Sequence, residues 1–464
     1  MRFVDLFAGL GGFHRALAAL GHECVFASEI DPELQQIYRK KNFPDAANVV
    51  HGDIRSSKGL IPPHDILCAG FPCQPFSKSG MQNGRRDRTR GTLFHEIVEV
   101  LEAHHPQFVI LENVGNFERH NRGRTWKVVK ETLKGKGYHV VGTTHVTTGG
   151  HGLVSPHHLG HPHTRERFFI VATREPLCID PFPPREKRFT SLGSITQLST
   201  SLTVADHSET RLTKQQVDCI DHWNQLLSLI PPEMPLPSFP IWGDEIRATY
   251  PFETKIPSTL SRRELRTHVR GSEDVIGKSK ADLLEMLPSY ARAPVFPEWK
   301  KAFIRQNREW FERIGPFVAD AWVTRLEAFP ASLRKLEWNC KGEERDLWKH
   351  VLQFRPSGLR VKRICSSPAL VAMTTTQTPI LGPQRRFLTR IEGLRLQGFP
   401  DSHQLPMSRE RAFAALGNAV HVDLVRYIVE RVLSAPISAP QRLRAVATKG
   451  EARLQLQVER SWLT

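Results

Sequence analysis

Long apolar runs and paired cysteines are both missing from this sequence of 464 residues. No apolar run approaches the roughly 18–20 residues that a membrane-spanning helix needs. The N-terminus turns glycine-rich too soon for a signal peptide. The seven cysteines include no CxxC pair, which argues against a disulfide framework and against a structural zinc ribbon. We therefore expect a cytoplasmic protein without membrane contact.

The sequence does have an excess of positive charge. It contains 64 Lys and Arg against 48 Asp and Glu, a formal net charge of +16. Hydrophobic residues make up 40%, an ordinary globular balance that excludes wholesale disorder. A basic chain of this size favours a polyanionic partner. On charge alone, a basic surface without a specific partner is an equal alternative.

Residues 1–172 alternate between short apolar runs and segments with helical spacing. This alternation indicates βαβ units and a mostly parallel sheet, hence an α/β fold. Strands are expected at 2–7, 24–28, 65–69, 108–111, 138–141 and 168–172, and helices at 13–20, 32–41, 93–103 and 126–134.

The sequence pattern changes after residue 172. Proline clusters interrupt the alternation, and seven of the nine tryptophans lie between 174 and 385, most of them expected in a core. Regular patterns return later, with helices expected at 391–396 and 420–433. We expect a catalytic and cofactor-binding domain at 1–173, a separate smaller domain at 174–385, a return to the first domain at 386–435 and a tail at 436–464.

A glycine-rich turn follows the first expected strand, in the run DLFAGLGGF at 5–13. Glycines between a strand and a helix let the backbone approach a ligand closely. Glu29 and Asp31 follow the second expected strand, where a carboxylate can bind ribose hydroxyls. Asp53, in the run GDI, can accept a hydrogen bond from an adenine amino group. The pattern indicates a nucleoside cofactor, and a plain strand-to-helix turn is the alternative.

Three further segments carry groups with catalytic chemistry. Cys73 lies between two prolines in GFPCQPFS at 70–77, a stiff loop that can aim a thiol outward for nucleophilic attack. Glu112 follows the run 108–111, where partial burial would raise its pKa towards neutrality. Arg165 and Arg167 precede the strand at 168–172, and guanidinium groups suit a ring carbonyl or a phosphate.

In this order, these segments resemble those of the C5-cytosine DNA methyltransferases. The resemblance covers residues 1–172 and roughly 386–433, and in this family the intervening segment is the target recognition domain. It implies a Rossmann-like, S-adenosylmethionine-dependent methyltransferase fold. Besides the segments above, it is carried by GTLF at 91–94, ENV at 112–114, RERFFIVA at 165–172, RLQGFPDS at 395–402 and GNAVHVDLV at 417–425.

The resemblance also implies a mechanism and a set of site residues. Cys73 would attack C6 of a cytosine flipped out of duplex DNA, Glu112 would protonate N3, and Arg167 would hold O2, with Arg165 beside the pocket. S-adenosyl-L-methionine would then give its methyl group to C5. The residues expected at this cofactor are Phe7, Ala8, Gly9, Gly11, Gly12, Glu29, Ile30, Asp53, Ile54, Pro72, Leu93, Asn418 and Ala419.

Two details of the cofactor site are specific to this sequence. Gly11 and Gly12 are expected to let the backbone reach the amino-acid end of the cofactor. Ile30 stands where many family members carry a large aromatic residue, so weaker stacking on the adenine is expected. The five histidines within 151–163 have irregular spacing and no acidic neighbour in the sequence, so we expect no metal site.

Contacts to DNA are expected in two places. Residues 77–90 should form a loop that closes over the DNA, with Ser79, Arg85 and Arg86 in contact with it. The basic stretch 355–363 should contact the DNA backbone. Its contributing residues are Arg355, Arg360, Lys362 and Arg363.

We therefore expect a monomeric DNA (cytosine-5)-methyltransferase of bacterial or phage type. A restriction endonuclease would act on the same site without binding the enzyme. Two alternatives stay open. The first is a tRNA cytosine-5 methyltransferase, against which the length of 174–385 argues. The second is a catalytically silent DNA-binding relative, against which the intact Cys73, Glu112 and Arg167 argue.

Overall fold

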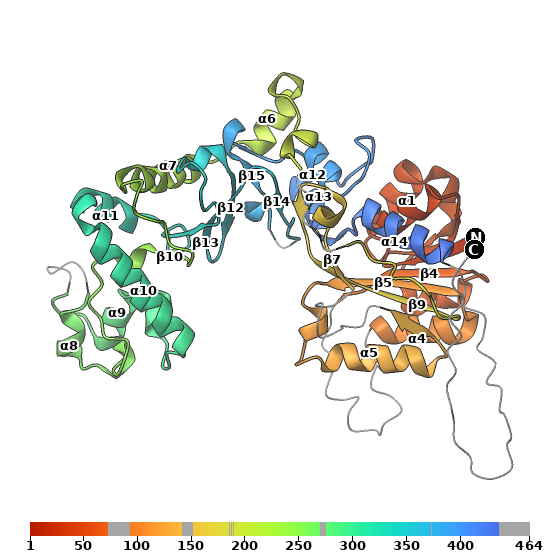
Figure 1. Cartoon of the computed structure of the whole chain (residues 1–464), viewed down its shortest axis with the longest axis horizontal. Helices are drawn as coiled ribbons and strands as arrows, with labels where there is room; N and C mark the ends of the chain where they lie inside the picture. Colours follow the sequence, from red (N-terminus) through yellow and green to blue (C-terminus); the bar gives the residue numbers. More distant parts are fainter. Residues whose placement is uncertain are drawn as a thin grey trace, which may run out of the picture.

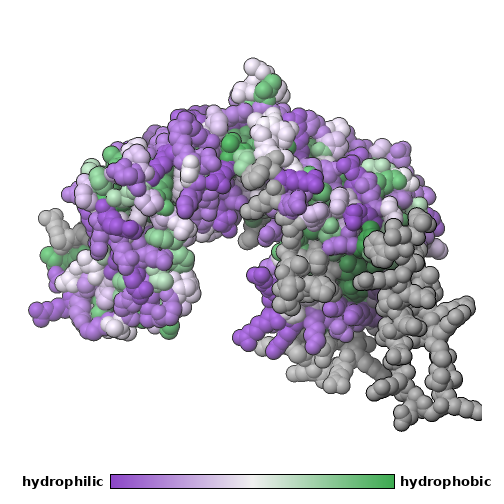
Figure 2. Space-filling model, viewed as in Figure 1, coloured by the Kyte–Doolittle hydropathy of each residue, from purple (hydrophilic) through white to green (hydrophobic). Residues whose placement is uncertain are grey.

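The computed structural model describes residues 1–72, 93–141, 152–184, 186, 188, 190–269, 275–372 and 374–435. These residues form two large sheets, each covered by helices, and a small two-stranded sheet between them. The two large parts form the two ends of an arch (Figure 1). Open space separates these ends in the space-filling view (Figure 2).

The first sheet contains eight strands in the order β3-β2-β1-β4-β5-β9-β6, with β7 also paired to β9. Strands β1 to β5 run parallel, and β9 runs antiparallel to its neighbours. The expected α/β fold with a mostly parallel sheet is confirmed. The strands are β1 (Arg2–Leu6), β2 (Glu23–Ser28), β3 (Val50–His51), β4 (Ile66–Gly70), β5 (Phe108–Val114), β6 (His139–Val141), β7 (Leu153–Val154) and β9 (Arg167–Thr173).

Helices cover both faces of this sheet (Figure 1). In β1, Phe3 packs on the side of α1 and α14, whereas Val4 and Leu6 pack on the side of α4 and α5. Both faces are therefore buried, which explains why the strands read as continuous apolar runs. The helices of this part are α1 (Gly12–Ala18), α2 (Pro32–Ile37), α3 (Ile54–Ser57), α4 (Leu93–His104), α5 (Arg124–Gly135), α12 (Arg390–Leu396), α13 (Arg409–Asn418) and α14 (Val422–Ser434).

The C-terminal helices return to the first sheet. The stretch 409–434 is long and apolar enough to cross a membrane by length and composition. It consists of two helices, α13 and α14, and 72% of its most apolar window is buried inside the protein. This apolar stretch therefore belongs to the protein core. Sequence patterns predicted α12 and α14 but missed α13.

The second sheet contains six strands in the order β10-β11-β13-β12-β15-β16. Helices α7, α10 and α11 pack on one of its faces, and α8 and α9 surround a second apolar cluster further out. Six of the seven tryptophans of 174–385 are buried here, and Trp299 is exposed. The elements are β10 (Ile241–Trp242), β11 (Lys335–Trp338), β12 (Val351–Arg355), β13 (Gly358–Lys362), β15 (Ile380–Leu381), β16 (Arg386–Phe387), α6 (Val204–Thr210), α7 (Lys214–Leu229), α8 (Arg262–Arg266), α9 (Lys280–Glu285), α10 (Glu298–Ile314) and α11 (Asp320–Glu327).

The two parts are joined more closely than composition predicted. Phe182, Leu192 and Ile195 belong to the apolar cluster of the first sheet, and the second sheet ends only at β16. The apolar core of the first sheet thus includes residues of the range 174–385, and among them are Val351 of β12 and Leu381 of β15. The small sheet links the parts directly, because β14 (Ser367–Pro368) pairs with β8 (His163–Thr164).

Candidate active site

Among the glycines of the turn after β1, Gly9 faces open space, whereas Gly11 and Gly12 pack closely against other side chains. A Cβ at Gly9 would meet no atom within 4 Å, so this position is open. A Cβ at Gly11 would overlap the Phe43 ring, and one at Gly12 would lie 2.6 Å from the Val420 side chain. Gly9 therefore leaves room for a ligand. Gly11 and Gly12 are required by packing against Phe43 and Val420, and their expected contact with a ligand stays a prediction.

A cavity of about 520 Å³ opens beside this turn. The Glu29 carboxylate accepts hydrogen bonds from the backbone N–H groups of Gly9 (2.7 Å) and Asp31 (2.8 Å). Burial raises the pKa of Glu29, and these hydrogen bonds oppose the rise. Its oxygens have lone pairs left for ribose hydroxyls. The residues expected at the cofactor that line this cavity are Phe7, Glu29, Ile30, Asp53, Ile54, Pro72 and Leu93.

Two acidic residues near the cavity already have partners. Asp31 caps α2 by accepting from the N–H of Glu33 (2.9 Å), and it pairs with Arg411 (2.8 Å). Asp53 accepts from Nε of Arg55 (2.9 Å), and this hydrogen bond is the main cause of the lowered pKa of Asp53. Arg55 lines the cavity mouth and was missed by the sequence analysis. A basic residue two positions after the capping Asp53 was the available signal.

A second cavity of about 390 Å³ adjoins the first, because Phe7, Glu29 and Pro72 line both. A ligand in one cavity can thus reach a ligand in the other beside Pro72. The remaining expected site residues that line the second cavity are Ala8, Gly9, Glu112, Arg165, Arg167, Asn418 and Ala419.

Glu112 supplies a buried carboxyl group to the second cavity. It lies on β5 between Gly70 of β4 and Phe169 of β9, and only 6% of it is exposed. Its Oε1 is 3.1 Å from Nε of Arg167, close enough for an ion pair but without hydrogen-bond alignment. Burial raises the pKa of Glu112, and the charge of Arg167 only partly opposes this. Glu112 thus holds a proton more firmly than a free carboxyl group.

Arg165 has a different environment from Arg167. It is 1% exposed, and its guanidinium donates to the carbonyls of Gly417 (2.7 Å), Ala419 (2.9 Å) and Leu370 (3.3 Å). These carbonyls occupy its terminal nitrogens. The hydrogen bonds of Arg165 thus go to the protein backbone, and the residue also lines the second cavity.

Asn113 was not among the predicted site residues, although it lies next to Glu112. Its amide donates to the carbonyl of Phe71 (2.8 Å). It thereby holds the backbone two residues before Cys73. Cys73 itself lies outside the described residues, as do Ser79, Arg85 and Arg86.

Successive side chains along a strand point to opposite faces of the second sheet, and this places three of the four basic residues expected at DNA on the same face. Arg360 faces Gln353 across β12 and β13, and Arg355 faces Gly358, so Arg355, Arg360 and Lys362 share one face of the sheet. The intervening Leu359 and Val361 lie in the apolar core. Arg363 follows the end of β13 and pairs with Glu343 (2.8 Å).

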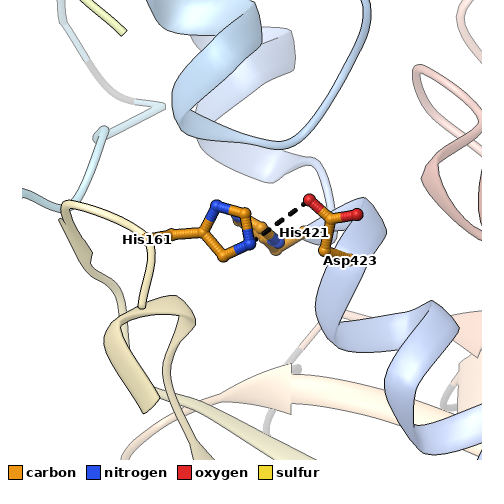
Figure 3. A group of neighbouring side chains, drawn as sticks. All are labelled: His161, His421 and Asp423. Atoms are coloured by element: carbon orange, nitrogen blue, oxygen red, sulfur yellow. Dashed lines mark ion pairs between the residues drawn. The ribbon is translucent and has the colours of Figure 1, made fainter. Parts of the chain in front are cut away.

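One group of potential metal ligands, His161, His421 and Asp423, lies where β8 approaches α14 (Figure 3). Nε2 of His161 is 3.3 Å from the Asp423 carboxylate. His421 accepts the N–H of Leu424 at Nδ1 (3.4 Å), which places the proton of a neutral ring on Nε2. A protonated Nε2 cannot bind a metal. We therefore assign the group to helix capping and ion pairing.

Comparison with known proteins decides the family. The family model for C-5 cytosine-specific DNA methylase matches residues 1–434. The chain belongs to this family. The activity expected from the sequence, DNA (cytosine-5)-methyltransferase, is thus confirmed, and the family implies S-adenosylmethionine as methyl donor.

Two named relatives agree with this assignment. Type II methyltransferase M.AluI of Cellulosimicrobium cellulans is 36% identical over 92% of this chain and 91% of its own length. Type II methyltransferase M.HhaI of Haemophilus parahaemolyticus is 42% identical over 39% of this chain and 52% of its own. Among solved structures, a putative DNA modification methyltransferase encoded within an E. coli prophage has a TM-score of 0.46 at 17% identity, covering 94% of this chain and 99% of that one.

Proposed function

We propose that this methyltransferase acts on a cytosine flipped out of duplex DNA, through a transient covalent bond between the Cys73 sulfur and C6 of the base. The observation that carries the proposal is the buried Glu112 carboxyl group, which lines a cavity with Arg167 and Pro72. A proton donor, a cation and the residue before the nucleophile therefore surround one space. That space adjoins the cavity suited to the cofactor.

The chain's own groups have the following roles. The Cys73 thiolate attacks C6 while Glu112 gives its proton to N3, which leaves an enamine whose C5 is nucleophilic. Arg167 donates to O2 and stabilises the charge that develops on the ring. After C5 has taken the methyl group, with S-adenosylhomocysteine as the leaving group, a base removes the C5 proton, the Cys73 thiolate leaves, and N3 returns its proton to the Glu112 carboxylate. The product is 5-methylcytosine.

The first cavity fits the adenosyl part of S-adenosylmethionine, which would supply an electrophilic methyl group. Glu29 would bind the ribose hydroxyls, Asp53 the adenine amino group, and Ile30 would contact the ring. The open position at Gly9 leaves space for the ligand. Asn418 and Ala419 would border the end of the cofactor near the target base, since they line the second cavity.

The rest of the molecule would select the DNA site. We propose that the second part, expected at 174–385, is the target recognition domain, and that Arg355, Arg360 and Lys362, which share one face of its sheet, contribute to it. Arg363 is engaged by Glu343 and by the carbonyl of Lys341, so we leave it out of this proposal. The loop with Ser79, Arg85 and Arg86 would close over the DNA. The type II names of the relatives support pairing with a restriction endonuclease. One catalytic centre in an asymmetric chain supports a monomeric enzyme, which would act on DNA in the bacterial cytoplasm.

The first test is methylation of a mixed-sequence plasmid by the purified enzyme with S-adenosylmethionine, read by bisulfite sequencing. Protected cytosines confined to one short motif would support the proposal. A duplex with 5-fluorocytosine at that position should then trap the enzyme, because fluorine cannot leave as a proton. The trapped band on a denaturing gel should disappear in Cys73→Ser.

Other outcomes distinguish the alternatives. Methylation of tRNA without protection of DNA would overturn the proposal in favour of an RNA substrate. Binding of DNA and cofactor without any methyl transfer would favour the silent relative. Methylated DNA without a trapped 5-fluorocytosine complex would contradict the covalent mechanism alone.

A further inference from the structure

An arginine on the polar face of the second sheet is fixed by a carboxylate. Nε of Arg360 donates to one oxygen of Glu337 (2.7 Å), and the Ser357 hydroxyl donates to the other (2.8 Å). The Glu337 side chain is 13% exposed and that of Arg360 is 28% exposed. The pair is therefore sheltered by the sheet but remains accessible from its polar face.

This pairing leaves the outer end of the Arg360 guanidinium available. Within the described part of the chain, neither of its terminal nitrogens has a hydrogen-bond partner, and neither is a buried, unsatisfied atom. A guanidinium anchored at Nε has lost much of its conformational freedom. It presents two parallel N–H donors in a fixed plane.

The face that carries Arg360 is turned away from the core of its own domain. Leu359 and Val361 occupy the opposite face with α7 and α11. The end of β13 lies near the catalytic part, because Ser366, four positions after Lys362, is hydrogen bonded to Thr164 (2.7 Å). Burial and the neighbouring arginines lower the pKa of Lys362.

The same face bears two other cations. Arg355 stands at the end of β12, beside the turn, and Lys362 ends β13. A lysine offers a point charge rather than a planar fork. Both are suited to phosphate groups, which carry no sequence information directly.

We propose that Arg360 determines specificity by reading one guanine of the recognition site, an inference that rests on the proposed function. Its two terminal nitrogens donate to O6 and N7 of the base in the major groove. Glu337 is the positioning residue that holds the guanidinium in place. Arg355 and Lys362 flank it and contact the DNA backbone.

The chain offers a matched control in Arg363. Its Nε donates to Glu343 (2.8 Å), just as Arg360 pairs with Glu337, but one terminal nitrogen donates to the carbonyl of Lys341 (2.6 Å). Arg363 also lies beyond the end of β13. Arg363→Lys thus makes the same substitution as Arg360→Lys in a second Arg–Glu pair. We expect this second arginine not to contact a base, because it lies off the strand and also binds a backbone carbonyl.

The test uses the full-length enzyme and a pool of duplexes with randomised flanks around one cytosine, read by bisulfite sequencing. Wild type should select one motif. Arg360→Lys keeps the charge but loses the fork, so selection at a single G·C position should relax about 10- to 100-fold, with other positions unchanged. Glu337→Gln should relax the same position less, and Arg363→Lys should leave the motif intact.

Each outcome has a distinct meaning. An even loss of methylation across all duplexes in Arg360→Lys would make Arg360 a phosphate contact and overturn the inference. Relaxed selection at an A·T position, or the same relaxation in Arg363→Lys, would also overturn it. Thermal melting of each variant checks folding, and Glu337→Gln provides the answer if Arg360→Lys does not fold. A wild-type enzyme that methylates no motif would instead contradict the proposed function.

Discussion

Burial at single residues determines the chemistry of this site. Glu112 and Arg167 lie 3.1 Å apart, yet removal from water outweighs their attraction and raises the pKa of Glu112. The carboxyl group is thereby suited to give a proton to a base near neutral pH. Glu29 also has a raised pKa, but two backbone N–H groups hold it as an acceptor.

Replacement of Glu112 by Gln should abolish proton donation and lower the rate of methyl transfer about 10²- to 10⁴-fold. Binding of DNA and of S-adenosylhomocysteine should persist. The wild-type rate should fall as pH rises through the raised pKa of Glu112, because the protonated form is required. A mutant that retains the wild-type rate at its optimum would contradict this role.

The same raised pKa predicts a stability effect. The folded state prefers the neutral form of Glu112, so its contribution to stability is complete below the unfolded pKa of about 4.3. This contribution is lost as pH rises through the higher folded pKa. Glu112→Gln should therefore lose less stability than wild type between pH 5 and pH 8, measured by urea unfolding. If the unfolding free energies of the two proteins depend on pH in the same way, the raised pKa of Glu112 would be refuted.

At the scale of elements, a buried ion pair joins β16 to α12. The Glu392 carboxylate is fully buried and accepts from both terminal nitrogens of Arg386 (2.8 and 2.6 Å). It also accepts from the backbone N–H groups of Thr389 (2.8 Å) and Gln197 (2.9 Å). One side chain thus ties the end of the second sheet to the first helix of the returning segment.

Removal of this carboxylate by Glu392→Ala should cost about 3–5 kcal/mol of unfolding free energy, because Arg386 would remain buried and unpaired. The matched control is Glu209→Ala, which removes the partner of Arg390 in a pair that is 24–34% exposed. That change should cost about 1 kcal/mol or less. Urea unfolding measures both, and equal losses would show that burial is not the cause.

At the scale of the whole molecule, Arg165 joins segments that lie far apart in the sequence. The carbonyls to which it donates lie 205, 252 and 254 positions along the chain. They belong to the segment after β14, to the last turn of α13 and to the residue that follows this helix. Arg165 therefore holds the returning C-terminal segment against the second cavity.

Arg165→Ala should leave three buried carbonyls without their donor and destabilise the enzyme by on the order of 3 kcal/mol. Methyl transfer should fall further than the loss of folded protein explains, because Asn418 and Ala419 are no longer held in place at the cavity that they line. Thermal melting and the rate per folded enzyme measure the two effects. Arg395→Ala, which breaks an exposed pair with Asp401, should change neither.

DNA affinity should fall steeply with salt, since several Lys and Arg side chains would displace counterions from phosphates. Arg355→Ala and Lys362→Ala should each reduce the slope of log affinity against log salt by about 1. Fluorescence anisotropy of a labelled duplex measures this slope. A wild-type affinity that does not respond to salt would contradict a basic DNA-binding face.

By itself, the sequence determined six of the eight strands of the first sheet, most of its helices and the chemical groups at the carboxyl ends of the strands; it missed β3 and β7. These features depend on near neighbours, since apolar runs and a glycine turn act over a few residues. The six-stranded sheet escaped prediction because its strands are short and pair across long stretches of chain, as β10 does with β11.

Only the tertiary structure decided which groups face the same space. Gly11 and Gly12 look like ligand contacts in the sequence, but Phe43 and Val420 require them to be small. Arg360 and Arg363 look equivalent, but strand alternation leaves one on a polar face and the other beyond it. In each case the deciding contact comes from outside the local motif or from strand pairing, where packing rather than local pattern sets the role of a side chain.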